Sequence, residues 1–97
     1  MRGALLIDRE RFRVERDGQD IRLTPKEFEL LLLLAAHPGR VMTHRALLSA
    51  IWGPNAVRQP EHLRVLVGTL RKKLERDASS PKYILTEPWV GYRFGDL

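Results

Sequence analysis

Apolar residues recur at helical spacing between residues 61 and 76. Intervals of three and four residues bring side chains to one face of an α-helix, so this segment predicts a helix with one buried face. That face consists of Leu63, Val67, Leu70 and Leu74. We expect the rest of the chain to pack against this face and to hold the helix in place.

The opposite face of this helix combines small residues with long cations. At about 100° per residue, Val65, Gly68 and Lys72 point away from the apolar face, and Arg64 and Arg71 lie on its flank. A glycine within a helix costs roughly 1 kcal/mol relative to alanine, which favours a surface that another molecule approaches closely. We therefore predict that this helix lies in a groove of DNA, although its charge alone fits a solvated basic face equally well.

Alternation with a period of two predicts an antiparallel sheet before the first helix. Phe12 and Val14 alternate with charged residues as in a half-buried strand. A turn is predicted at residues 16–19, after which Ile21 resumes the alternation. Residues 5–8 predict a further short strand.

Two more helices are predicted in the middle of the chain. The first covers residues 24–36, because Thr24 can cap it, Pro25 suits the first helical position and Glu27 closes a capping box. The second covers residues 44–52, which carry apolar side chains at helical spacing. These helices and the helix at residues 61–76 are expected to form the core.

Two other places offer contacts to a nucleic acid. His44 and Arg45 fall in the first turn of the second helix, where they either reach a phosphate or remain solvent exposed. Residues 83–86 and 92–94 predict a C-terminal hairpin with Trp89 near its tip. The indole either packs on the body of the domain or lies exposed and contacts a partner.

Composition and charge narrow the class of protein. The 97 residues suffice for one small domain, and they include no cysteine for a disulfide framework or a thiolate metal site. The longest apolar run, residues 30–36, is too short to cross a membrane, and the N-terminus lacks the core of a signal peptide. We expect a cytoplasmic protein without a membrane contact. The net charge is +5, and its excess lies in residues 58–76, a footprint typical of nucleic-acid binding.

The sequence offers no catalytic or metal-binding constellation. His37, His44 and His62 lack the spacing of metal ligands, and no glycine-rich loop that could hold a phosphate is present. The neighbouring carboxylates of Glu75 and Asp77 lie in charged sequence typical of a surface. We therefore expect no enzyme, no cofactor and no metal.

Several stretches in order carry a resemblance to a known family. They are LTPKEFELL at residues 23–31, PGRVMT at 38–43, LL at 47–48 with WG at 52–53, LRKKL at 70–74 and VGYRF at 90–94. From about Leu5 onward, the chain resembles the winged-helix effector domain of the OmpR/PhoB class of two-component response regulators. WGPNAV at residues 52–57 and ILTE at 84–87, with Leu63, Arg64 and Gly68, also resemble the Kdp-type subgroup, which controls a high-affinity potassium-transport operon.

The resemblance implies an α+β fold: a winged helix-turn-helix with an N-terminal antiparallel sheet, three helices and a C-terminal β-hairpin wing. It implies that residues 1–97 are a single effector domain, which regulates transcription by binding double-stranded DNA as a homodimer on tandem half-sites. The third helix would enter the major groove, and the wing would reach the adjacent minor groove or backbone. The receiver domain of such regulators, which is phosphorylated on Asp, is absent from this sequence, so we expect an excised effector domain. The loop expected to contact RNA polymerase includes Asn55, Ala56, Val57 and Arg58.

The candidate DNA contacts differ in kind. Arg64 is favoured for guanine edges, because the N-terminal half of a recognition helix usually enters the groove, whereas Arg71 binds either bases or phosphate. Val65 can pack on a thymine methyl, and Gly68 lets the backbone approach. Weaker candidates for contacts, mainly to phosphate, are Thr69, Lys72, Thr86 and Tyr92, of which Tyr92 is alternatively part of the core.

The chain departs from its class at two places. Residues 66–69 are LVGT where members of the class often carry basic residues, and Pro88 and Trp89 stand where many have Arg-Gly. A minor-groove arginine is therefore not available at the wing tip. The alternative function is a winged-helix module that binds protein instead of DNA. Structured RNA is a weaker alternative, because the deep, narrow major groove of A-form RNA excludes a helix.

Overall fold

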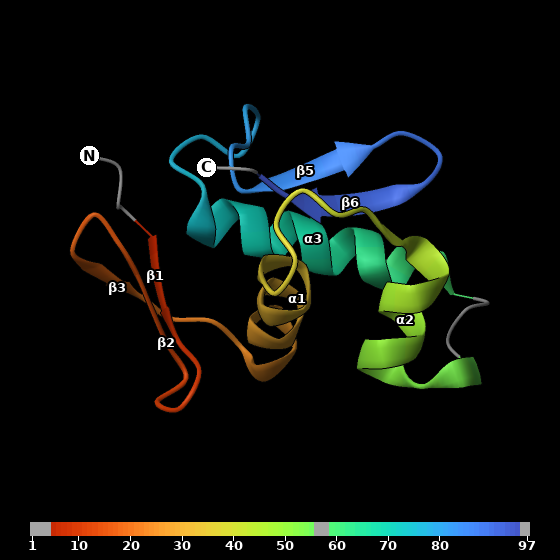
Figure 1. The fold of residues 1–97 in the computed structure, drawn as a ribbon, viewed down its shortest axis with the longest axis horizontal. Helices are drawn as coiled ribbons and strands as arrows, with labels where there is room; N and C mark the ends of the chain where they lie inside the picture. The colour runs from red at the N-terminus through yellow and green to blue at the C-terminus, as the bar shows by residue number, and fades with distance from the viewer. Residues whose placement is uncertain (1–4, 56–58, 96–97) are drawn as a thin grey trace.

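The computed structural model describes residues 5–55 and 59–95, which form three α-helices and two three-stranded antiparallel sheets (Figure 1). The elements, in chain order, are β1 (Leu5–Asp8), β2 (Arg13–Arg16), β3 (Gln19–Ile21), α1 (Pro25–Ala35), β4 (Met42–Thr43), α2 (His44–Trp52), α3 (Pro60–Leu74), β5 (Ile84–Glu87) and β6 (Gly91–Phe94). Figure 1 shows α1 and α2 on one side of α3, with the hairpin of β5 and β6 on the other.

The N-terminal sheet has the order β1-β2-β3, as the alternation predicted. A two-residue turn joins β2 to β3, and both of its residues, Asp17 and Gly18, have positive φ (54° and 83°). This is the pattern of a type I′ turn, whose twist suits a hairpin and which favours Asp-Gly. Val14 is 1% exposed and faces the core.

The prediction that Phe12 belongs to a half-buried strand was wrong. Phe12 precedes β2, has φ 53° and is 75% exposed. The carboxylate of Asp8 accepts hydrogen bonds from the amides of Glu10 and Arg11 at 3.1 and 3.2 Å, so a turn replaces the expected start of the strand. The Phe12 ring still contacts the Phe28 ring, with centroids 5.2 Å apart.

The start of α1 follows the predicted capping box. Thr24 Oγ1 accepts from the Glu27 amide at 3.2 Å, and Glu27 Oε1 accepts from the Thr24 amide at 2.9 Å. The Glu27 carboxylate is buried and also accepts a hydrogen bond from Lys73 Nζ of α3 at 2.7 Å. The Glu27 side chain therefore both caps the N-terminus of α1 and holds α1 against α3.

The core lies between the three helices and the C-terminal sheet. The stripe expected on α3 is buried, with Leu63, Val67, Leu70 and Leu74 between 0% and 2% exposed. Burial at this level removes nearly all of their apolar surface from water, which is the main stabilising contribution to the fold. The other buried side chains of the core are Val14, Phe28, Leu30, Leu31, Leu34, Leu47, Leu48, Ile51, Leu66, Tyr83, Ile84, Tyr92 and Phe94.

The C-terminal sheet has the order β4-β6-β5, in which β4 was not predicted. Met42 and Thr43 pair with Tyr92 and Gly91 of β6. A Cβ atom at Gly91 would overlap the Met42 carbonyl, so only glycine allows this approach. This short strand fixes the N-terminus of α2 beside the wing.

The observed elements confirm the predicted α+β fold with an N-terminal sheet, three helices and a C-terminal wing. Within residues 5–55 and 59–95, no helix has the length and apolar character needed to span a bilayer.

We expect Glu27→Gln to lower the free energy of unfolding by about 1–3 kcal/mol at pH 7, because it removes a buried charge-assisted hydrogen bond. Burial acts to raise the pKa of Glu27, but the hydrogen bonds from Lys73 and from the Thr24 amide together hold it below its ordinary value of 4.5. The native carboxylate thus stabilises the fold above pH 4.5, and this contribution is lost as the pH falls through the lower folded-state pKa.

Urea unfolding of both proteins between pH 7 and pH 3 measures this effect. The difference between wild type and variant should shrink below about pH 4.5. A difference that is constant over the whole range would contradict the assigned role of the carboxylate.

Candidate nucleic-acid interface

The N-terminal half of α3 presents Arg64 and Val65 to solvent. The Arg64 side chain is 77% exposed and lies 3.9 Å from the Glu61 carboxylate, and Val65 is 63% exposed. A surface ion pair at this distance is worth well under about 1 kcal/mol, so Arg64 is free to exchange Glu61 for another acceptor. This part of α3 combines an available guanidinium with an exposed apolar side chain.

The middle of α3 is less uniform. Gly68 is partly exposed, and no atom of another part of the fold would lie within 4 Å of a Cβ added there. Thr69 is partly buried and donates its hydroxyl proton to the Leu66 carbonyl at 3.0 Å, whereas Lys72 is exposed. Gly68 and Lys72 therefore share the exposed face, while the Thr69 hydroxyl is occupied within the helix.

Arg71 connects α3 to the wing. Its Nε and Nη2 atoms donate to the Ile84 carbonyl at 3.0 and 2.8 Å, and Nη2 also donates to Thr86 Oγ1 at 2.8 Å. Its guanidinium carbon lies 5.7 Å from the centre of the Tyr92 ring, within cation–π range. Because α3, β5 and β6 all contact this one side chain, it sets the position of the wing relative to α3.

Tyr92 and His44 meet where the wing adjoins α2. Tyr92 is 8% exposed, and its ring centre lies 5.5 Å from that of His44 in an edge-on arrangement. The His44 amide donates to the Val90 carbonyl at 3.2 Å, and Thr43 Oγ1 accepts from the Ala46 amide at 3.0 Å. These contacts occupy two of the first amides of α2 and so attach it to the wing.

The remaining predicted contacts are more exposed. Arg45 is exposed in the first turn of α2, and Thr86 is exposed on β5 with its hydroxyl oxygen accepting from Arg71. Asn55 is exposed in a short helical turn after α2. Of the other residues predicted to contact RNA polymerase, Ala56, Val57 and Arg58 lie outside the described residues.

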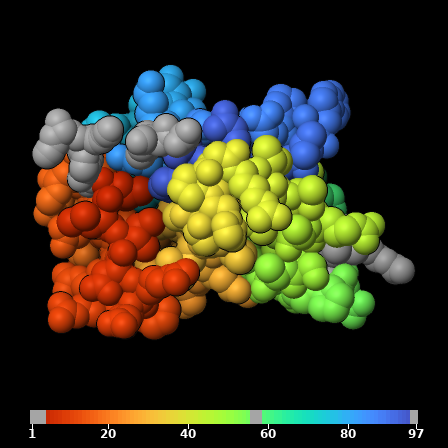
Figure 2. All heavy atoms as spheres, viewed as in Figure 1, coloured from red at the N-terminus to blue at the C-terminus, as the bar shows by residue number. Residues whose placement is uncertain are grey.

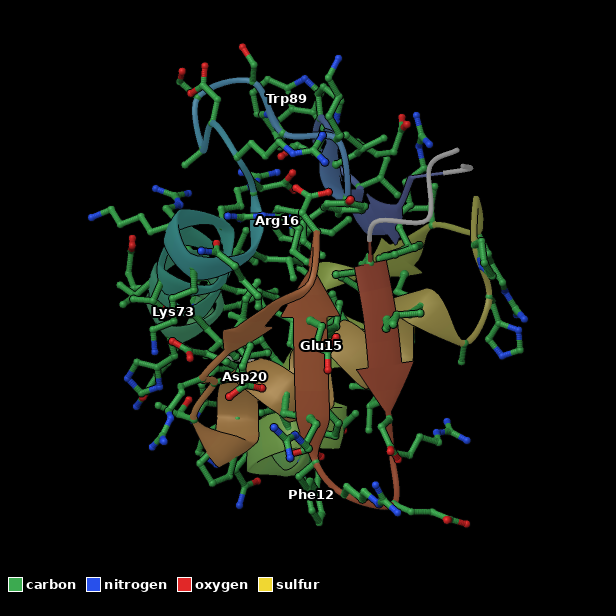
Figure 3. All side chains as sticks on the ribbon, turned by 90° about the vertical axis from the view of Figure 1, so that its left-hand side faces the viewer. Phe12, Glu15, Arg16, Asp20, Lys73 and Trp89 are labelled. Atoms are coloured by element: carbon green, nitrogen blue, oxygen red, sulfur yellow. The ribbon has the colours of Figure 1, made fainter. Side chains whose placement is uncertain are left out.

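The residues that hold the C-terminus of α3 were not predicted from the sequence. Glu75, which was expected at the surface, is 4% exposed, and its carboxylate accepts backbone amide hydrogen bonds from residues 82–84 at 2.8–3.1 Å. Arg16 Nη1 donates to the Leu74 carbonyl at 2.7 Å, so a cation satisfies the C-terminal end of the helix. Figure 3 shows Arg16 and Lys73 where the N-terminal sheet meets α3.

A second contact ties the N-terminal hairpin to the same end of α3. Arg76, just after the helix, donates to Asp17 in the β2–β3 turn, and the Nε–Oδ2 distance is 2.8 Å. This hydrogen bond lowers the pKa of the Asp17 carboxyl. Nothing in the local sequence indicated this contact, because its two partners lie 59 residues apart along the chain.

The arrangement of helices and strands defines the class of protein. Three helices with an antiparallel hairpin wing form a winged-helix domain. The exposed face of α3 carries the cationic side chains of Arg64 and Lys72. Figure 2 shows the wing and α2 at the end of the molecule opposite the N-terminal sheet. Within residues 5–55 and 59–95, no cluster of side chains suited to hold a metal ion is found.

Comparisons with known proteins agree with this class. The family described as "Transcriptional regulatory protein, C terminal" matches residues 18–94. The KDP operon transcriptional regulatory protein KdpE of Escherichia coli (strain K12) is 46% identical over 81 residues, which cover 84% of this chain and 36% of that protein.

Two solved structures are similar over nearly the whole chain. The response regulator DrrB, a Thermotoga maritima OmpR/PhoB homolog, has a TM-score of 0.90 and 38% identity, covering 97% of this chain and 42% of that one. The Klebsiella pneumoniae RstA DNA-binding domain, in complex with the RstA box, has a TM-score of 0.87 and 33% identity, covering 98% and 94%.

The chain therefore belongs to the OmpR/PhoB-type family of response-regulator effector domains, which are winged-helix, DNA-binding regulators of transcription and not a known family of enzymes. Its resemblance to the Kdp-type subgroup is matched by the similarity to KdpE. The chain spans little more than a third of the length of that relative, since it covers 36% of it.

We expect Arg71→Ala to lower the free energy of unfolding by about 1–3 kcal/mol, because the carbonyl of buried Ile84 loses its two charge-assisted donors. Arg64→Ala is the matched control: it removes the same charge from the same helix but should change stability by less than about 0.5 kcal/mol. Urea unfolding measures both. Equal, small effects would show that the contact of Arg71 with the wing contributes little.

Proposed function

We propose that this domain is the DNA-binding output domain of a two-component response regulator, with α3 in the major groove and the wing on the adjacent minor groove or backbone. The observation that carries the proposal is the exposed basic face of α3 beside a wing that Arg71 fixes to it. A helix and a hairpin in fixed relation can enter neighbouring grooves without reorganisation, which reduces the entropy lost on binding.

The proposed contacts follow from exposure. Arg64 reads guanine O6 and N7, and Val65 packs on a thymine methyl, because both side chains project from the N-terminal half of α3. Gly68 lets the helix backbone approach the duplex. Lys72 and Arg45, both exposed, neutralise phosphates. The solved RstA domain, with 33% identity, was captured with its own DNA box, which supports this mode of binding.

Four other candidates have roles in this proposal that follow from their contacts. Arg71 positions the wing, since two of its nitrogen atoms already donate to β5. Tyr92 and His44, packed edge to face, hold the N-terminus of α2 beside the wing. Thr86 keeps its hydroxyl proton for a phosphate, because its oxygen accepts from Arg71.

The proposal extends to the partners of the whole regulator. Similarity to KdpE supports control of a potassium-transport operon. The domain would bind there as a homodimer on tandem half-sites, as the resemblance to the response-regulator class implies. The residues between α2 and α3, which include Asn55, would contact RNA polymerase, and a receiver domain would control the output. On this proposal, residues 1–97 are a single effector domain that acts in the cytoplasm, where the bacterial chromosome lies.

The alternative is a winged-helix module that binds protein instead of DNA. The exposed Trp89 and Val90 at the wing tip favour it, because apolar side chains at a tip suit a protein partner. Binding that is insensitive to salt and lost on changing Trp89 would support this alternative.

The Gly68→Ala variant should affect the stability of the fold and the affinity for DNA in opposite directions. Because space around Gly68 is open, alanine should raise the free energy of unfolding by about 0.5–1 kcal/mol. If the helix backbone lies against a duplex, the added methyl should weaken binding by roughly tenfold, equivalent to about 1.4 kcal/mol. The measurements are thermal unfolding and binding to a duplex that the wild-type domain selects from a random-sequence pool.

Ala50→Gly, on the exposed side of α2, is the control for this experiment. It should lower stability by a similar amount and leave the affinity for the duplex unchanged. A Gly68→Ala variant that is more stable and binds DNA as tightly as wild type would show that this part of α3 does not approach the duplex closely.

A further inference from the structure

The tip of the wing presents a tryptophan that the fold does not use. Trp89 is 97% exposed, and the next residue, Val90, is 48% exposed. Figure 3 shows Trp89 at one extremity of the molecule and the exposed Phe12 at the other. A large aromatic side chain left in water contributes nothing to the core, so its presence calls for another explanation.

The backbone at Trp89 is also strained. The Val90 amide donates to the Glu87 carbonyl at 3.0 Å, which closes a four-residue turn with Pro88 and Trp89 at its centre. Trp89 is the third residue of this turn and has φ 69°, the pattern of a type II turn, in which glycine or asparagine is preferred. A bulky residue in the left-handed region indicates a functional constraint when the surrounding structure holds it there.

The surrounding structure does hold it. The Val90 carbonyl accepts from the His44 amide at 3.2 Å, and the Arg93 Nε atom donates to the Glu87 carboxylate at 2.8 Å across the base of the turn. Gly91 packs directly on the Met42 carbonyl. The indole is therefore presented on a braced turn, which limits the conformational entropy lost when it binds.

The chemistry of the tip suits the inside of a minor groove better than a phosphate. Pro88, Trp89 and Val90 carry no charge, so the tip cannot form an ion pair with the backbone. An indole has an apolar face for deoxyribose and for base edges, and its N–H can donate to the acceptors on the floor of the minor groove. Proteins that bind this groove often insert apolar side chains at base steps.

We propose that Trp89 inserts into the minor groove beside the site of α3 and packs its indole on deoxyribose and base edges. The inference rests on the proposed function, and it adds a contact that no cation of the chain supplies at this position. The Arg71 contacts to β5 link the wing to α3, so the helix and the indole engage one duplex together.

The chain has two tryptophans, which makes a direct test possible. In the Trp52→Phe background, Trp89 is the only indole, and its fluorescence reports its surroundings. The probe is a duplex with a single half-site, taken from sequences that the wild-type domain selects and protects in a footprint. A shift or quenching of the Trp89 emission that saturates at one domain per duplex is the expected result.

Substitutions at Trp89 give the second measurement. Trp89→Gly should leave the melting temperature unchanged or raise it, because glycine suits the turn, while affinity for the single half-site falls about tenfold. Trp89→Phe retains an aromatic face and should lose much less affinity. Both variants should keep the base preference of α3, because the major-groove contacts are untouched.

Two results would overturn the proposal and leave the proposed function standing. In the first, the domain protects the duplex but the Trp89 emission and the affinity of Trp89→Gly do not change. In the second, the emission changes only when two half-sites are present, which would place the indole against a second copy of the domain. A domain that protects no selected duplex would overturn both the proposed function and this inference.

Discussion

The hydrogen bonds between the Arg71 guanidinium and β5 determine how the two candidate DNA-contacting elements are placed. Without them, α3 and the wing would be joined mainly by apolar contacts, which are non-directional, and by the amide hydrogen bonds that Glu75 accepts at the start of β5. With them, one planar donor group spans the Ile84 carbonyl and the Thr86 hydroxyl. The exposed residues of α3 and those of the wing tip therefore form one surface with a fixed geometry.

The other polar contacts of the domain serve the same helix. Lys73 reaches the buried Glu27 at the start of α1, and Arg16 donates to the Leu74 carbonyl at the end of α3. Glu75, directly after the helix, accepts hydrogen bonds from the amides of residues 82–84 and so connects the end of α3 to the start of β5. Arg71 and Lys73 in the C-terminal half of α3 are thus used for positioning, whereas Arg64, Val65 and Lys72 are left exposed. The helix is thus held mainly by its C-terminal half, while its exposed face remains available for contacts.

Local sequence rules predicted much of this fold because they depend on neighbouring residues. The stripe on α3, the Thr24–Glu27 capping box and the Asp17–Gly18 turn each follow from spacing within a few positions. Distant partners could not be predicted. The pairing of β4 with β6, the burial of Glu75 and the engagement of Arg71 depend on segments that meet only in the folded chain. Phe12 shows the limit of alternation, since an Asp8 side chain that accepts two amides outweighed the pattern.

A footprint of the domain combined with a salt titration tests the central claim most directly. The fragments should include the region upstream of a potassium-transport operon of the source organism. We expect protection of two tandem half-sites one helical turn apart, with log K falling against log salt at a slope of about −2 or steeper per subunit, since Lys72 and Arg45 each neutralise a phosphate. Protection elsewhere with the same slope would keep the DNA-binding mode and discard the operon. A slope near zero, or no protection at low salt, would contradict a basic helix lying in a groove.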